Sequence, residues 1–170
     1  KVGVQFVAPS GRESQPFLFN EYDPRDCAQT WHVERAEFDM LLFDNAREQG
    51  AECQDETRVL DVGLPGTPPH AIHLRLANGS EQTITARVLV DATGQQAYLA
   101  NRLGLKVDNP ELHKAAIWGY YRGASRRGPE GPELTTILHT HEKRNWFWYI
   151  PLAADIVSIG LVGDNDELLR

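Results

Sequence analysis

The last third of the sequence contains strand-length apolar segments joined by very short connections. "LTTILHTH" and "WFWYIPL" flank the tetrapeptide "EKRN", and "IVSIGLVG" follows after "AAD". Connections this short join antiparallel neighbours, because parallel strands need a crossover of roughly a dozen residues or more. "KAAIWGYYRGA", further upstream, is also typical of a strand, and the "RRGPEGPE" between them predicts a loop. We therefore predict an antiparallel sheet in the region 105–170.

An amphipathic helix is the second clear element. In "VERAEFDMLLFDNAREQG", the residues Phe38, Leu41, Leu42 and Ala46 recur at helical spacing on one face. Gly50 stands where a helix often ends in a left-handed residue. The pattern predicts a helix that stops near Gly50.

Two shorter patterns follow the helix. "HAIHLRLANGSEQTITARV" alternates on both sides of Asn78-Gly79, which predicts a β-hairpin. "VLVDATG" then carries three consecutive apolar residues, which is typical of a strand buried on both faces in a parallel sheet. Asp91 would end that strand, Gly94 would open a sharp turn, and a short helix would begin near Tyr98. Together with an opening strand that reaches about Val7, the pattern predicts a mixed α/β (α+β) fold.

Composition excludes several classes of function. The 170 residues are 41% hydrophobic and carry a net charge of -7 without a basic stripe, which argues against nucleic acid or an anionic membrane as a partner. No apolar run is long enough for a transmembrane helix. Cys27 and Cys53 form neither a metal motif nor a disulfide framework, so we expect a cytoplasmic protein. The chain starts with Lys1 and its single methionine is Met40, so we expect an internal piece of a larger protein.

Three segments carry a family resemblance. "WHVERAEFDMLLFDNAREQGAE" and "ARVLVDATGQQAYLANRLGL" resemble the middle of FAD-dependent enzymes of the p-hydroxybenzoate hydroxylase-like superfamily. That superfamily includes aromatic hydroxylases, geranylgeranyl reductase-like proteins and halogenases. "WFWYIP" matches W-x-W-x-I-P, the motif associated with flavin-dependent halogenases, through Trp146, Trp148, Ile150 and Pro151. The chain therefore resembles a fragment of a flavin-dependent halogenase.

The resemblance implies a division of the chain. Residues 1–32 would supply a strand and loop of the substrate-binding region. Residues 33–104 would form the middle part of a Rossmann-like FAD-binding domain with a small β-meander, and residues 105–170 the antiparallel sheet of the substrate domain. No G-x-G-x-x-G fingerprint is present, and the prolines of "GLPGTPP" cannot donate the N–H groups that hold a pyrophosphate. We expect that the isolated chain does not retain FAD.

The tryptophan motif has two interpretations. Strand alternation places Trp146, Trp148 and Ile150 on one face and Phe147 and Tyr149 on the other. Burial of one tryptophan contributes about 4–6 kcal/mol, so core packing alone is a sufficient explanation. The resemblance implies in addition that the motif lines a passage between flavin and substrate. The tryptophans would then keep the organic substrate away from the flavin while a small oxidant passes.

The resemblance also implies a catalytic lysine. In halogenases this lysine begins a strand of pattern K-x-x-x-x-F, and "KVGVQF" fits with Lys1 and Phe6. A lysine in a closed apolar pocket loses its charge more easily and can carry or hydrogen-bond an electrophilic halogen species. The alternative is an exposed lysine at a strand end.

Cofactor-binding residues are implied at two places. Arg35 lies at the start of the helix, where a cation opposes the macrodipole, so a partner must compensate it. In the superfamily an arginine here approaches FAD, whereas the alternative is an exposed helix end. Asp91, Thr93 and Gly94 follow the "VLV" segment, at the end of a strand where open α/β sheets place ligands. The alternative for them is a plain tight turn.

The resemblance implies the following function. FAD, reduced by a separate flavin reductase, would use O₂ and a halide ion to halogenate a small electron-rich aromatic substrate, possibly tethered to a carrier protein. An aromatic hydroxylase, a geranylgeranyl reductase-like oxidoreductase and a non-enzymatic β-rich binding module are the alternatives. His139 and His141 share a strand face without a third ligand at a telling spacing, so we predict no metal site.

Overall fold

The computed structural model describes residues 1–64, 66–125, 134–142 and 144–168. It divides into two compact units. Unit 1 comprises Lys1–Leu42 and Pro110–Arg170, and unit 2 comprises Phe43–Asn109. Each unit has its own β-sheet. The mixed α/β fold class is confirmed.

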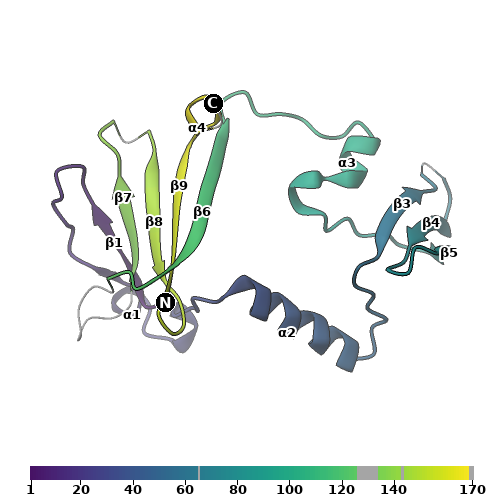
Figure 1. Ribbon diagram of the computed structural model, residues 1–170, viewed down its shortest axis with the longest axis horizontal. Helices are drawn as coiled ribbons and strands as arrows, with labels where there is room; N and C mark the ends of the chain where they lie inside the picture. Colours follow the sequence, from purple (N-terminus) through teal and green to yellow (C-terminus); the bar gives the residue numbers. More distant parts are fainter. Residues whose placement is uncertain (65, 126–133, 143, 169–170) are drawn as a thin grey trace. The chain divides into compact units, whose positions relative to one another are not determined.

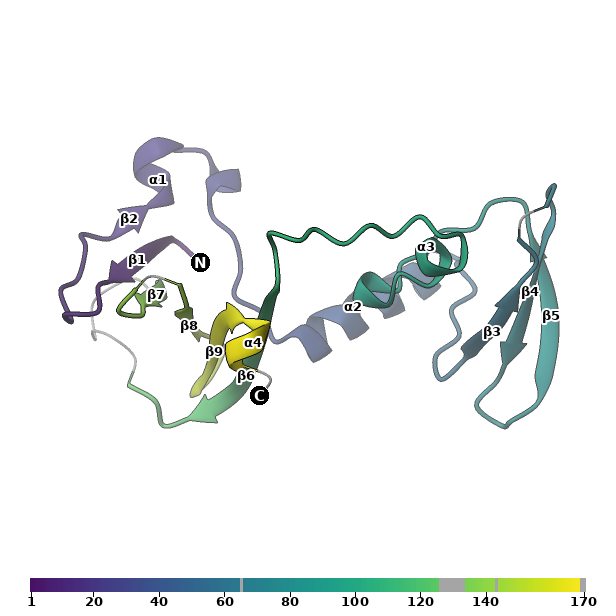
Figure 2. The ribbon, with the colours of Figure 1, turned by 90° about the horizontal axis from the view of Figure 1, so that it is seen from above.

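Unit 1 is built on a six-stranded sheet. In both Figure 1 and Figure 2 its long strands lie side by side. Only the pair of the first strand with the strand that begins at Thr135 is parallel, and the other pairs are antiparallel. The order across the sheet is β2 (Phe17–Leu18), β1 (Gly3–Val7), β7 (Thr135–His139), β8 (Trp146–Pro151), β9 (Ile156–Asp164) and β6 (Lys114–Arg122).

The two short connections behave as predicted. β8 pairs antiparallel with both β7 and β9, so the hairpin prediction is confirmed. The parallel contact of β1 with β7 was not predicted, because it joins segments more than a hundred residues apart in the sequence. The predicted loop "RRGPEGPE" covers residues 126–133, which lie outside the described residues.

Alternation gives the sheet two different faces. Val7, Pro151 and the fully buried Val157 lie on one face of the sheet. The opposite face carries Trp146 and Trp148, and the registers of β1, β7, β9 and β6 identify the side chains that share it. This second face is called the aromatic face below. Its members include Phe6, Ile137, His139, Trp146, Trp148, Ile150, Ser158, Gly160, Trp118 and Tyr120.

Short helical segments complete unit 1. They are α1 (Phe19–Tyr22), the 3₁₀ turn η1 (Asp26–Ala28) and α4 (Asn165–Leu168). The predicted long helix is α2 (Arg35–Glu48), which begins in unit 1 and ends beyond the boundary at residue 42. Gly50 follows it with φ +92°, as expected for a helix end. Three of the apolar side chains predicted to share one face, Phe38, Leu41 and Leu42, are exposed.

Unit 2 consists of a three-stranded antiparallel meander and a short helix. The strands are β3 (Arg58–Val62), β4 (His70–Arg75) and β5 (Glu81–Ala86), followed by the 3₁₀ turn η2 (Gly94–Gln96) and α3 (Tyr98–Arg102). Gly79 has φ +82° in the β4–β5 turn, so the predicted Asn78-Gly79 hairpin is confirmed. The core of the unit is Val62, Ile72 and Leu74, against which Leu89 and Leu99 pack.

The predicted strand "VLV" does not form. Val88 is 77% exposed and Val90 is 80% exposed, and no strand is assigned to either residue. A strand needs neighbours that accept and donate its backbone hydrogen bonds. Within the described residues of unit 2 the meander is closed as β3-β4-β5, and none of its strands pairs with this segment. The apolar pattern shows that the segment is suited to burial, but it does not show which strand the segment would pair with.

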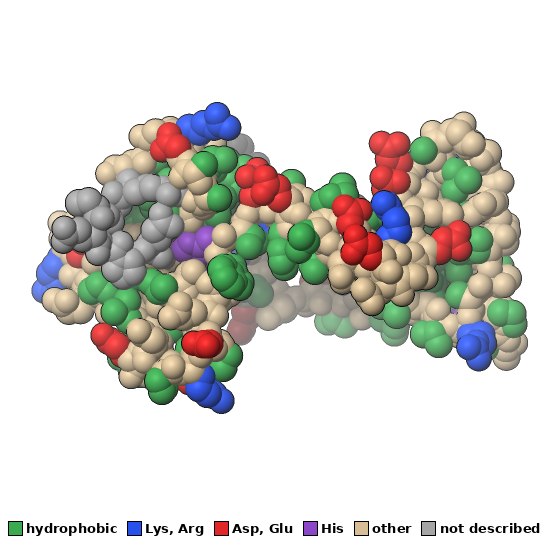
Figure 3. Space-filling model, turned by 90° about the horizontal axis from the view of Figure 1, so that it is seen from below, with side chains coloured by type: hydrophobic (Ala, Val, Ile, Leu, Met, Phe, Trp, Pro, Cys, Tyr) green, Lys and Arg blue, Asp and Glu red, His purple; other side chains and the backbone are tan. Residues whose placement is uncertain are grey.

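No helix among the described residues is long and apolar enough to cross a membrane. On the face shown in Figure 3, lysine and arginine side chains stand singly and do not gather into a patch. Among the described residues, no three of the side chains that commonly bind metals form a group that could hold an ion.

Candidate functional site

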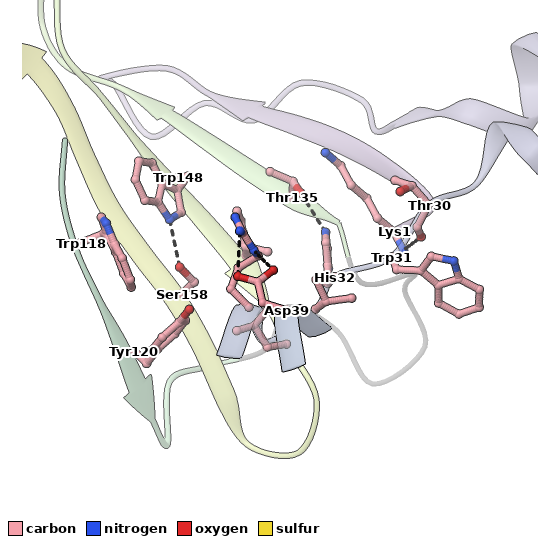
Figure 4. Close-up of a pocket in the computed structure, with 14 residues that line it drawn as sticks. Lys1, Thr30, Trp31, His32, Asp39, Trp118, Tyr120, Thr135, Trp148 and Ser158 are labelled. Carbon is pink, nitrogen blue, oxygen red and sulfur yellow. Dashed lines mark hydrogen bonds and ion pairs between the residues drawn. The ribbon is translucent and has the colours of Figure 1, made fainter. Parts of the chain in front are cut away.

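Unit 1 has a cavity of about 680 Å³ over the aromatic face, called the main cavity below. Ligand sites of small-molecule enzymes have volumes of roughly 300–1,000 Å³, so this cavity has the size of a cofactor site. Figure 4 shows its lining, which comes from the chain start, the segment before α2, the first turns of α2, and strands β6 to β9. The lining residues are Lys1, Thr30, Trp31, His32, Val33, Arg35, Asp39, Trp118, Tyr120, Thr135, Trp148, Ile150, Leu152 and Ser158.

Trp148 is the best-fixed aromatic side chain of the cavity. Its Nε1 donates a hydrogen bond to Ser158 Oγ at 3.1 Å. Its ring lies directly over Gly160, where a Cβ atom would be 2.2 Å from Trp148 Cζ2. The ring thus comes from β8, whereas β9 supplies both its hydrogen-bond acceptor, Ser158, and the space that it occupies over Gly160. Trp146 adjoins it with ring centroids 6.2 Å apart.

A second aromatic pair comes from the edge strand β6. Trp118 and Tyr120 meet edge to face with ring centroids 5.3 Å apart. The register places Trp118 opposite Gly160, so the small residue in β9 separates two tryptophans from neighbouring strands. The result is an apolar wall with hydroxyl groups of Ser158 and Tyr120 at the cavity.

Lys1 lies at the rim of this cavity and is half-buried. Its backbone is fixed by Thr30, because the carbonyl of Lys1 accepts a hydrogen bond from Thr30 N at 3.1 Å and the Lys1 amino nitrogen donates to Thr30 O. The Lys1 Nζ lies 5.8 Å from the centroid of the Phe19 ring. A cation over an aromatic ring is a favourable contact, so Phe19 of α1 helps to hold the Lys1 ammonium group in position.

Arg35 has the partner that its position requires. Its guanidinium donates two hydrogen bonds to the Asp39 carboxylate, at 3.0 and 2.9 Å, one helical turn further on. The hydrogen bonds that Arg35 donates to Asp39 raise the pKa of Arg35 above its ordinary value. The arginine side chain is nevertheless 71% exposed and faces the cavity, so its outer N–H groups can bind an anion.

His32 is a cavity residue that the sequence did not single out. Its Nε2 lies 3.0 Å from Oγ1 of the buried Thr135, which ties the segment before α2 to the start of β7 (Figure 4). Its neighbour Trp31 also lines the cavity but is 84% exposed. The available signal was the position of both residues directly before the helix.

Comparison with known proteins now identifies the family. A sequence profile described as tryptophan halogenase matches residues 20–166. The chain belongs to the tryptophan halogenase family. It is 32% identical over 148 residues to a flavin-dependent halogenase of Armillaria mellea, which covers 82% of this chain and 28% of that protein. It is 29% identical over 168 residues to the 1H-pyrrole-2-carbonyl-[peptidyl-carrier protein] chlorinase of Pseudomonas fluorescens, covering 95% of this chain and 37% of the chlorinase.

The solved structures agree with this assignment. The myxobacterial chondrochloren halogenase, described as a variant of FAD-dependent halogenases, superposes with a TM-score of 0.84 at 26% identity. The superposition covers 98% of this chain and 38% of that one. The chain therefore spans about a third of the length of the relatives it matches.

The main cavity of this halogenase-family chain brings together four of the residues implied by the resemblance. Lys1, Arg35, Trp148 and Ile150 all line it. Trp146 stands beside Trp148 but does not reach the lining. Pro151 is buried on the opposite face of the sheet, opposite Val157.

Asp91, Thr93 and Gly94 belong to unit 2. Asp91 Oδ1 accepts hydrogen bonds from Thr93 N and Oγ1 at 3.0 and 2.6 Å, and Oδ2 accepts one from Leu99 N at 2.8 Å. The hydrogen bond from the Thr93 side chain, and those from the Leu99 and Thr93 backbones, lower the pKa of Asp91. Asp91 and Thr93 also line a smaller cavity of about 390 Å³. The bond from Leu99 satisfies an N–H group at the start of α3, and a role toward FAD stays a prediction.

Proposed function

We propose that the complete protein is an FAD-dependent halogenase that acts on a small electron-rich aromatic substrate. The observation that carries the proposal is the convergence in one cavity of Lys1, Arg35 and the motif residues Trp148 and Ile150. These residues come from three separate parts of the sequence, namely the chain start, α2 and β8. A structural core would need the tryptophan and the isoleucine, but it would have no use for a lysine and an arginine.

The residues present fit a flavin ring. The cavity has a flat aromatic wall in Trp148 and Trp118, and the exposed guanidinium of Arg35 offers donors to an anionic group. When bound, reduced FAD supplies the activation of O₂ by which halide is oxidised to hypohalous acid. Arg35 would hold the cofactor, and Asp91, Thr93 and Gly94 would contact it from residues 33–104. Residues 1–32 and 105–170 would form the substrate side.

The aromatic wall would separate the two reactants. Trp148 is held between Ser158 and Gly160, so its ring cannot swing aside without loss of a hydrogen bond. A wall held in this way excludes an aromatic substrate from the flavin and lets a small oxidant pass. Ile150 extends the same surface toward the end of β8.

Lys1 would perform the transfer. Its ammonium group donates a hydrogen bond to the oxygen of hypohalous acid, which makes the halogen more electrophilic. The aromatic carbon forms a bond to the halogen as the oxygen–halogen bond breaks, and Lys1 gives its proton to the departing hydroxide, so that water is released. The neutral amine then accepts the proton lost from the ring carbon. In total, one aromatic C–H group and one molecule of hypohalous acid are converted to one C–halogen bond and one molecule of water.

The partners follow from this chemistry. A separate flavin reductase would supply reduced FAD, and the halide would be the second small substrate. One relative is named for a pyrrole carbonyl group tethered to a carrier protein, so we propose a carrier-tethered aromatic acyl group as the substrate of this protein. We place the enzyme in the cytoplasm, where reduced flavin is available.

A halide requirement tests the proposal. The complete enzyme, reduced FAD, O₂ and an aromatic substrate are incubated with and without chloride or bromide, and the products are analysed by mass spectrometry. We expect a halogenated product that depends on the halide. A hydroxylated product formed without halide would support the aromatic hydroxylase instead. Protein that neither binds flavin nor consumes O₂ would support a binding module.

A further inference from the structure

A second cavity of about 360 Å³ lies over the aromatic face of unit 1, at the far end of β1 and β7. It is called the Arg12 cavity. Lys1 and Thr135, from the starts of these parallel strands, line the main cavity, whereas Phe6 and His139, from their ends, line the Arg12 cavity. Its lining is completed by the loop after β1, through Ala8, Pro9, Arg12, Glu13 and Ser14.

The loop that closes this cavity is held in place by its backbone. Ser14 N donates to Phe6 O at 2.8 Å, and Phe6 N donates to Ser14 Oγ at 3.1 Å. Ala8 N donates to Arg12 O at 2.9 Å, and Gly11 turns the chain with φ +81°. The loop therefore presents its side chains from a fixed frame.

The cavity offers donors for an anion. Arg12 forms no ion pair within the described residues, so its guanidinium is available. The Glu13 carboxylate also lines the cavity, and it accepts a hydrogen bond from Gln5 Nε2 at 3.3 Å. His139 adds an imidazole whose buried Nδ1 has no hydrogen-bond partner among the described residues. Arginine is the side chain best suited to a phosphate group.

An aromatic row connects the two cavities. Phe6 and His139 stack with ring centroids 6.1 Å apart and an interplanar angle of 13°. His139 pairs with Trp146 across the β7–β8 ladder, and Trp146 adjoins Trp148 of the main cavity. Thr135 and His139 are four residues apart in one strand, a distance of about 13 Å. Phe6 and Trp148 both pair with Ile137, so a substrate that reaches from Arg12 to Trp148 would cross β7 on the aromatic face.

We propose that the Arg12 cavity binds the phosphate of the arm by which a carrier protein presents its aromatic acyl group. The arm would run along Phe6 and His139, and the ring would stop against Trp146 and Trp148, within reach of the oxidant held by Lys1. Arg12 thus selects a tethered substrate over a free acid. The inference rests on the proposed function for the identity of the substrate.

Binding tests it independently of catalysis. The affinity of the complete enzyme is measured for a carrier protein that bears the phosphate-linked arm and for the same carrier without it. We expect the armed carrier to bind roughly 10- to 100-fold more tightly, as for a hydrogen bond to a charged group. Arg12→Gln should abolish this preference, and Arg12→Lys should restore part of it. Arg87→Gln, which removes an exposed arginine of unit 2, should preserve it.

The outcomes separate the two proposals. A wild-type enzyme that does not distinguish the two carriers, or an Arg12→Gln variant that still does, would overturn the Arg12 inference even if halogenation is observed. In turnover, Arg12→Gln should raise KM for the tethered substrate and leave unchanged the rate with a small thioester that lacks phosphate. An equal loss with both substrates would also overturn it. Absence of halogenation with retained Arg12-dependent binding would contradict only the proposed function.

Discussion

At the scale of single residues, the main cavity depends on a fit between a large ring and a missing side chain. Trp148 occupies the space over Gly160, and its indole N–H is satisfied by Ser158. The sequence predicted that the tryptophans share a face, because that follows from strand alternation. It did not identify Gly160 or Ser158, because the β8–β9 register decides which residues lie beneath the ring.

Gly160→Ala tests this fit. The new methyl group would overlap the Trp148 ring, so we expect a loss of about 1–3 kcal/mol in the free energy of unfolding. Tryptophan fluorescence should shift as the ring moves. The matched control is Gly119→Ala in β6, where the nearest atom is an ordinary 3.4 Å from the added Cβ and belongs to the Tyr121 side chain. Equal effects of the two changes would show that Trp148 is not held by Gly160.

Trp148→Ala tests the wall in the complete enzyme. Loss of a packed tryptophan costs about 3–5 kcal/mol, so the variant is assayed at low temperature. We expect less halogenated product and more hypohalous acid captured by a chemical trap in solution, because the barrier has been opened. Phe147→Ala, on the other face of β8, should lower stability without raising the trapped fraction. Unchanged trapping in the Trp148 variant would contradict a barrier role.

At the scale of elements, local patterns predicted what local contacts decide. Both hairpins of the last third, the Asn78-Gly79 turn and α2 follow from spacing within a few residues. The parallel pairing of β1 with β7 and the failure of the "VLV" strand depend on distant partners. The same distinction holds for the site, where Arg35 could be matched to Asp39 in the same helix, whereas His32 meets Thr135 only through the fold.

One prediction at this scale concerns Asp91, because its carboxylate accepts hydrogen bonds that link the "DATG" turn to α3. Its pKa is lowered in the folded chain by the hydrogen bonds from Thr93 and Leu99. A carboxylate with a lowered pKa contributes stability that is present above its unfolded pKa of about 3.9 and is lost as pH falls through the lower folded value. Asp91→Ala should therefore lower Tm at pH 7, and the difference from wild type should shrink below pH 4. The exposed Asp108 provides a control, as Asp108→Ala should change Tm little at either pH.

At the scale of the whole molecule, the main cavity would serve two chemical tasks. Flavin chemistry would occur on the Arg35 side of the cavity, and halogen transfer would occur at Lys1 at its rim. The sequence alone predicted the family and the lysine by resemblance, and the structure adds that Lys1 lies in the same cavity as Arg35 and Trp148. Sequence spacing could not show this, because these residues are brought together only when β1 joins β7.

The most direct measurement follows O₂ consumption and halogenated product in one reaction of the complete enzyme with Lys1→Ala. We predict that O₂ consumption by reduced FAD continues and that halogenated product is lost, because only the transfer step needs the amine. Lys1→Arg should fail in the same way, since a guanidinium does not release its proton. A Lys1→Ala enzyme that halogenates at the wild-type rate, or one that loses O₂ consumption together with product, would contradict the assignment of halogen transfer to Lys1.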